Sequence, residues 1–140
     1  MRECLITTKG LSREEIVEVL DHAEKIGKDP ASYYGSQSGK IIGLLFYEPS
    51  TRTRMSFETA IKRLGGDTIS MGSVENSSVV KGETLADTIR VVAGYVDAIV
   101  LRPPKEGAAR MAGDFIDIPL INAGGGWCKN PKQKYLHQYT

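Results

Sequence analysis

The sequence has 140 residues, of which 41% are hydrophobic and 25% are charged, and its formal net charge is +1. These values are typical of one soluble globular domain that is long enough to bury its own core, and they exclude disordered and fibrous proteins. A net charge so close to zero argues against broad binding of nucleic acid, so any anion site must be local.

Two cysteines and two histidines are too few for a disulfide framework or a spaced zinc site. We therefore expect no metal and a reducing, cytoplasmic location. Charges interrupt every apolar stretch of the N-terminal segment MRECLITTKGLSREE, so it lacks the hydrophobic region of a signal peptide. The longest apolar or glycine run, residues 41–47, is too short to cross a bilayer, so we expect no membrane partner.

The first helix begins at a capping signature. Ser12 is followed three residues later by Glu15, and apolar residues then recur at helical spacing until Gly27. Residues 30–39 are rich in Ser, Gly and Tyr, which is typical of a loop, and the segment KIIGLLFYE that follows is typical of a buried strand.

The rest of the chain alternates helical and strand patterns. The expected elements are a helix at 54–64, a strand at 67–72, a polar loop at 73–81, a helix at 83–94, a strand at 98–101, a helix at 106–115 and a strand at 118–122. This alternation predicts an α/β fold, a three-layer parallel sheet with helices on both faces.

Ligands of such sheets collect at the carboxyl ends of the strands, where each strand turns into a loop. Four segments qualify, and all are polar or rich in glycine: 48–54, 72–81, 102–105 and 122–133. We expect them to converge on one pocket.

One of these segments, EPSTRTRMSFETA, combines hydroxyls and guanidinium groups at the start of a helix. Ser and Thr are ordinary there because they cap backbone N–H groups, whereas arginine is not, because the positive end of the helix dipole disfavours cations. The unusual group consists of Ser50, Thr51, Arg52, Thr53 and Arg54. It suits a phosphate or carboxylate held between the arginines, but the arginines could instead pair with Glu48 and Glu58, and spacing alone leaves both interpretations open.

Three motifs extend the argument: FYEPSTRTRMSFETAIKRLGG, then KGETLADTIRVVAGYVDAIVLRPPKEGAAR, then PLINAGGG. Together, and in this order, they resemble the carbamoyl-phosphate domain of aspartate carbamoyltransferase catalytic chains. The STRTR motif is shared with ornithine carbamoyltransferases, whereas KGETLADT and RPPKEGAAR resemble the aspartate branch. The resemblance implies that residues 1–140 form a carbamoyl-phosphate-binding domain with the carbamoyltransferase fold.

This resemblance implies transfer of a carbamoyl group from carbamoyl phosphate to L-aspartate in pyrimidine synthesis, without any cofactor. It implies catalytic roles for Thr53, Arg102 and Lys81. The implied carbamoyl phosphate ligands are Ser50, Thr51, Arg52, Thr53, Ser77, Lys81, Arg102, Asn130 and Gln133. In the family, the residues that match Ser77 and Lys81 enter the neighbouring subunit's site, which implies a homotrimer with shared active sites and is compatible with a further regulatory chain.

Three positions depart from the family pattern. Pro103 and Asn130 stand where the family has histidine, and Gly125 stands where it has an acid. Only isolated positions match after Gly126, which suggests a truncated or corrupted reading of a longer gene. The aspartate-binding domain of the family is also absent, so we expect an incomplete, inactive fragment.

Two alternatives to an enzyme fragment stay open. One is a non-catalytic phosphate-binding or interaction module derived from the same fold. The other is a nucleotide-binding domain, which is weaker because the chain has neither G-x-G-x-x-G nor a phosphate-binding loop of the G-x-x-x-x-G-K-[ST] type.

Overall fold

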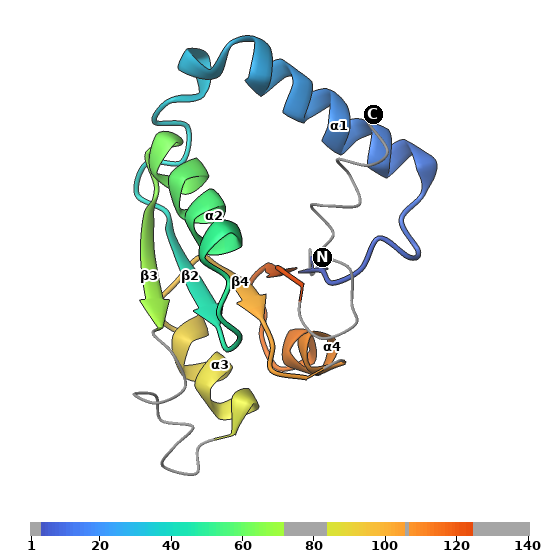
Figure 1. The fold of residues 1–140 in the computed structure, drawn as a ribbon, viewed down its shortest axis with the longest axis vertical. Helices are drawn as coiled ribbons and strands as arrows, with labels where there is room; N and C mark the ends of the chain where they lie inside the picture. Colours follow the sequence, from blue (N-terminus) through green and yellow to red (C-terminus); the bar gives the residue numbers. More distant parts are fainter. Residues whose placement is uncertain (1–3, 72–83, 106, 125–140) are drawn as a thin grey trace.

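The computed structural model describes residues 4–71, 84–105 and 107–124 (Figure 1). Its strands are β1 (Cys4–Leu5), β2 (Ile41–Phe46), β3 (Asp67–Met71), β4 (Ala98–Arg102) and β5 (Leu120–Asn122). Its helices are α1 (Arg13–Lys28), the short 3-10 helix η1 (Pro30–Tyr33), α2 (Thr51–Arg63), α3 (Leu85–Ala93) and α4 (Ala108–Asp114). The strands form one sheet in the order β1-β5-β4-β2-β3, and all of its pairs are parallel.

Apolar clusters lie on both faces of this sheet. On one face, Phe57 and Ile61 of α2 pack against a cluster that contains Leu44. On the other face, α3 and α4 contribute Ile89, Ala109 and Ala112 to a larger cluster that contains Leu45. Neighbouring strand residues point to opposite faces, and each fully buried Leu or Ile contributes about 1.5–3 kcal/mol. The predicted three-layer arrangement, with helices on both faces, is confirmed.

Gly43 permits the close approach of α3 to the sheet. A Cβ atom at this position would lie 3.2 Å from Val92 Cγ1 and 3.5 Å from Val96 Cγ2. A larger side chain would therefore push α3 outward and loosen the core that both branched residues help to fill.

Helix α1 begins as predicted. Ser12 Oγ accepts from the Glu15 backbone N–H at 3.1 Å, and the Glu15 carboxylate accepts from the Ser12 N–H at 2.7 Å. The helix extends away from the sheet in Figure 1, and none of its 16 residues is buried. Its start is thus fixed by local hydrogen bonds rather than by packing on the core.

Several element boundaries differ from the predictions. Helix α2 begins at Thr51 instead of residue 54, because Ser50 takes the N-cap position and the hydroxyl residues form the first turn. The predicted loop at 30–39 contains η1, which starts at Pro30, a residue well suited to a first turn. The other predicted helices and strands shift by one or two residues at their ends, and β4 extends to Arg102.

Strand β1 was not predicted. It is only two residues long, and it pairs with β5 through Cys4 opposite Leu120 and Leu5 opposite Ile121. Such a short segment carries no periodic pattern, so only its distant partner defines it.

Within the described residues, no helix is long and apolar enough to span a membrane.

Asp97 joins the amino ends of β2 and β4. Its carboxylate accepts from the Ile41 backbone N–H at 2.8 Å, and its own N–H donates to Ile41 O at 2.7 Å. Lys40 Nζ lies 3.5 Å from the same carboxylate. The Ile41 hydrogen bond, helped by the Lys40 charge, lowers the pKa of Asp97 below its ordinary value.

We predict that Asp97→Asn lowers the free energy of unfolding at neutral pH and flattens its dependence on acid. Because the folded-state pKa is lowered, the carboxylate stabilises the fold fully above about pH 5 and ceases to do so as the pH falls through the folded-state value, below about pH 4. Urea unfolding between pH 3 and pH 7 measures this difference. The matched control is Asp21→Asn on the exposed helix α1, and its stability should depend on acid as that of the unmodified chain does. If the stability of Asp97→Asn also shows the acid dependence of the unmodified chain, the proposed role of Asp97 is wrong.

Candidate anion-binding site

The carboxyl ends of the strands meet at one edge of the sheet because all the strands are parallel. Phe46 at the end of β2 lies opposite Arg102 at the end of β4, and the Tyr47 N–H donates to Arg102 O at 3.0 Å. On the other side of β4, Leu101 lies opposite Asn122. The loops that follow β2, β4 and β5 therefore start beside one another. That segments 48–54, 102–105 and 122–133 converge on one pocket stays a prediction.

The N-terminus of α2 lies at this edge, and its side chains leave it uncapped. Ser50 occupies the N-cap position, but its side chain makes no capping hydrogen bond, and the first turn contains no acid. By contrast, Ser12 caps α1, and Thr84 caps α3 by accepting from the Asp87 N–H at 3.2 Å. The first N–H groups of a helix have no partner within the helix, so those of α2 are suited to an external anion.

Residues with hydroxyl and guanidinium groups form the N-cap and the first turn of α2. Ser50 and Thr53 are half-buried, whereas Thr51, Arg52 and Arg54 are exposed. Among the described residues, no carboxylate forms an ion pair with Arg52 or Arg54. The alternative in which Glu48 and Glu58 neutralise these arginines is thus not what the structure shows.

Arg102 is the cationic group that Glu48 does neutralise. Arg102 Nη2 lies 3.4 Å from Glu48 Oε2, and the two side chains are 23% and 37% exposed. Arg102 Nε is buried and finds no hydrogen-bond partner in the described part of the chain. A buried donor without a partner costs about 1–3 kcal/mol, so this guanidinium retains the capacity to hold an acceptor.

Sequence reasoning missed two residues at this edge. It considered Glu48 only as a possible partner of the helix arginines, although β2 and β4 pair so that Glu48 faces Arg102. It also assigned no role to Asn122, which is 4% exposed and whose amide bonds to both Ile6 and Gly124. The only local signal for Asn122 was a polar residue that ends an apolar strand just before a glycine run.

Four of the predicted site residues lie outside the described residues, namely Ser77, Lys81, Asn130 and Gln133. The segment 72–81 falls there as a whole, as does the part of 122–133 that follows Gly124. The structure therefore places Arg102 and the start of α2 at the same edge of the sheet, while a shared site formed by the predicted residues stays a prediction.

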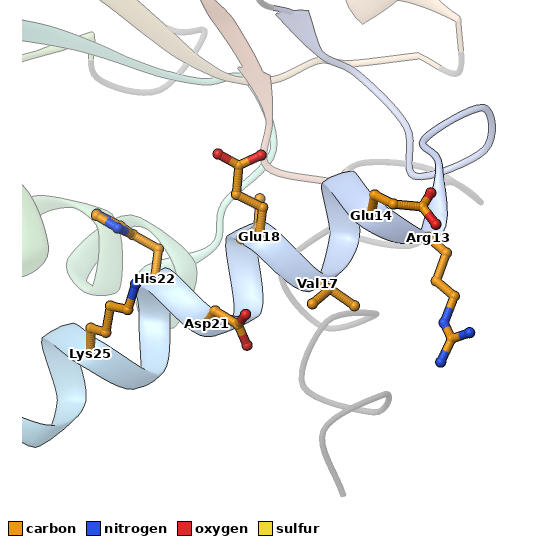
Figure 2. Close-up of a pocket in the computed structure, with 8 residues that line it drawn as sticks. Arg13, Glu14, Val17, Glu18, Asp21, His22 and Lys25 are labelled. Carbon is orange, nitrogen blue, oxygen red and sulfur yellow. The ribbon is translucent and has the colours of Figure 1, made fainter.

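A hollow along α1 is a weaker candidate (Figure 2). Its lining residues are Arg13, Glu14, Val17, Glu18, Val19, Asp21, His22 and Lys25. All eight come from one exposed helix, they mix both signs of charge, and none belongs to the edge that holds Arg102. Over residues 4–71, 84–105 and 107–124, no group of three or more His, Cys, Asp or Glu side chains could hold a metal ion.

Comparison with known families gives one match over nearly the whole chain. Residues 4–140 match the carbamoyl-phosphate binding domain of the aspartate/ornithine carbamoyltransferases. The aspartate carbamoyltransferase catalytic subunit of Haloquadratum walsbyi is 60% identical over 136 residues, which are 97% of this chain and 45% of that protein. That of Methanothrix thermoacetophila is 57% identical over 99% of this chain and 46% of its own length.

Solved structures show the same similarity. The catalytic subunit of M. jannaschii aspartate transcarbamoylase is 51% identical, with a TM-score of 0.88 over 99% of this chain and 46% of that one. Aspartate transcarbamoylase from Trypanosoma cruzi, solved in complex with carbamoyl phosphate, is 36% identical, with a TM-score of 0.88 over 97% of this chain and 45% of that one. The chain thus spans about 45% of the length of the relatives it matches.

We predict that Glu48→Gln strengthens the binding of inorganic phosphate about twofold to fivefold, because it removes a carboxylate that competes for Arg102. Titration calorimetry at low salt measures the affinity. The control Glu58→Gln removes an acid from α2 that forms no ion pair among the described residues, and it should change the affinity less. Weaker phosphate binding by Glu48→Gln would mean that Glu48 supports the site instead of competing with its ligand.

Proposed function

The chain belongs to the aspartate/ornithine carbamoyltransferase family, and from that premise we propose that it supplies the carbamoyl-phosphate half of an aspartate carbamoyltransferase active site. The complete enzyme would transfer the carbamoyl group of carbamoyl phosphate to L-aspartate, giving N-carbamoyl-L-aspartate and phosphate for pyrimidine synthesis. The observation that carries the proposal is the uncapped N-terminus of α2, which lies at the same sheet edge as Arg102.

The phosphate would bind at the start of α2. Its oxygens would accept from the first backbone N–H groups, from the hydroxyls of Ser50, Thr51 and Thr53, and from the guanidinium groups of Arg52 and Arg102. Arg102 Nε is free for this contact because it has no hydrogen-bond partner among the described residues. A helix N-terminus favours negative charge, and a charge-assisted contact with Arg52 adds to that preference.

The carbamoyl group would lie toward Arg102. As the amine of aspartate attacks, negative charge develops on the carbamoyl oxygen, and it passes to the phosphate when the C–O bond to phosphate breaks. Thr53 and Arg102 would stabilise the first charge, and the start of α2 would stabilise the second. Donors fixed in advance at both positions lower the barrier without a covalent intermediate.

The remaining roles follow from the family resemblance alone. Ser77 and Lys81 would enter the site of a neighbouring subunit, so the working form would be a cytoplasmic homotrimer with shared active sites, to which a regulatory chain could bind. Asn130 and Gln133 would contact the carbamoyl group. An asparagine amide can donate to the carbamoyl oxygen, but unlike histidine it cannot carry a positive charge.

A second candidate function is a phosphate-binding module without catalysis. The residues that favour it are Asn130 and Pro103, which stand where the family has histidine. Calorimetry separates the two functions, since an enzyme half-site should bind carbamoyl phosphate more tightly than inorganic phosphate. Equal affinities for the two ligands would favour the module.

We predict that Arg52→Ala weakens phosphate binding by about 1.5–3 kcal/mol, the usual contribution of a hydrogen bond to a charged group. The matched control is Arg63→Ala, which removes the same charge from the other end of α2, where the helix dipole disfavours anions. Calorimetry with inorganic phosphate should show a loss for Arg52→Ala and little change for Arg63→Ala. Similar losses of affinity in both variants would mean that Arg52 acts only through its contribution to the net charge of the chain.

We also predict that the 140-residue chain forms no detectable carbamoyl aspartate, although it binds carbamoyl phosphate. The matched region of its relatives is less than half of their length, and none of the residue roles proposed above positions the aspartate amine. Lost orientation alone can cost about 7–11 kcal/mol of the barrier reduction. A product assay with radiolabelled aspartate tests this, and turnover that Arg52→Ala abolishes would show that the chain assembles an active site by itself.

A further inference from the structure

Asn122 is one of two buried polar residues in the described part of the chain, the other being Thr88. Both ends of its side-chain amide form hydrogen bonds. Nδ2 donates to Ile6 O at 3.0 Å, and Oδ1 accepts from the Gly124 N–H at 3.0 Å. A buried amide with both ends bonded is held in one orientation, and removing it takes away the hydrogen-bond partners of the buried Gly124 N–H and of the half-buried Ile6 carbonyl.

The bond to Gly124 closes a turn at the end of β5. Gly124 is buried and has a φ of +87°, in the left-handed region that glycine tolerates best. The side-chain oxygen of an asparagine that accepts from the N–H two residues ahead forms a turn that does not depend on neighbouring strands. Asn122 therefore fixes the direction in which the backbone leaves the sheet.

This turn lies beside Arg102. The Ala123 N–H donates to Leu101 O at 2.8 Å, so the β4–β5 ladder continues to the residue next to Arg102 in the chain. The side chain of Ala123 is fully buried in the cluster that also contains Phe46, and Phe46 lies opposite Arg102. The backbone that Asn122 holds thus forms the β5 side of the edge from which the Arg102 guanidinium extends.

We propose that Asn122 is a positioning residue of the anion site, acting through the Ala123–Gly124 turn on Arg102. It touches no ligand itself. The amide suits this role better than an acid, since a carboxylate would add negative charge near the anion and could not donate to Ile6 O. The inference rests on the proposed function of this edge as a phosphate site.

The test compares Asn122→Ala with Ile6→Ala in the 140-residue chain, using calorimetry with inorganic phosphate and urea unfolding. Ile6→Ala trims an apolar side chain of the same N-terminal segment, but it keeps the Ile6 carbonyl and the turn at Gly124. We expect both variants to be less stable, and only Asn122→Ala to bind phosphate about fivefold to tenfold more weakly. Losses of affinity that are equal in the two variants, or no loss in either, would overturn the inference.

A double-mutant cycle with Arg102→Ala tests the route of the effect. If Asn122 acts through Arg102, Asn122→Ala should weaken phosphate binding no further in the Arg102→Ala background, whereas additive losses would overturn the inference. If Asn122→Ala does not fold, Asn122→Ser replaces it. We expect this variant to bind phosphate about twofold to threefold more weakly, because serine can still accept from the Gly124 N–H, though more weakly than asparagine. An unchanged affinity in Asn122→Ser would overturn the inference.

The same measurements separate this inference from the proposed function. Absence of phosphate binding by the unmodified chain would overturn the proposed function and this inference together. Binding that depends on Arg52 and Arg102, but not on Asn122, would overturn only the positioning role.

Discussion

The parallel register between β2 and β4 is the constraint on which the candidate site depends. It sets Phe46 opposite Arg102, and thereby brings the β4 arginine to the loop that leads into α2. A slip of one residue would turn every side chain of a strand to the other face. That slip is strongly opposed here, because Leu44 and Leu45 are both fully buried in different clusters. The same packing that stabilises the sheet therefore determines the geometry of the anion site.

Helix α2 owes its stability to packing and to its C-terminal end more than to its N-terminus. A good N-cap side chain typically contributes about 0.5–2 kcal/mol, and Ser50 does not make that hydrogen bond. Phe57 and Ile61 attach the helix to the sheet, and Gly65, with a φ of +85°, ends it where a Cβ atom would lie only 2.6 Å from Gly35 Cα. With its position fixed in these ways, the helix can leave its first N–H groups to a ligand.

Local patterns in the sequence were sufficient for the α/β class, the start of α1 and the presence of hydroxyl and guanidinium groups at a helix start. Pairings between distant residues were not predictable. The Arg102–Glu48 ion pair depends on strand register, and β1 depends on Leu120 and Ile121, so neither leaves a periodic signal. The position of α1 away from the sheet could not be predicted either, because amphipathic spacing specifies an apolar face but not what covers it. The roles of Ser77, Lys81, Asn130 and Gln133 stay predictions.

The pairing of β1 with β5 has a consequence for synthesis on the ribosome. The hydrogen bond between Ile6 and Asn122 joins residues that are 116 positions apart in the sequence. As the chain emerges from its N-terminus, Cys4 and Leu5 must remain unpaired until β5 has left the exit tunnel, while β2, β3 and β4 can already associate. Contacts of such long range form late, since the intervening chain must first lose its freedom. Completion of this edge of the sheet therefore waits until β5 has emerged, and until then the side of β4 that β5 will cover would be open to pairing with other nascent chains.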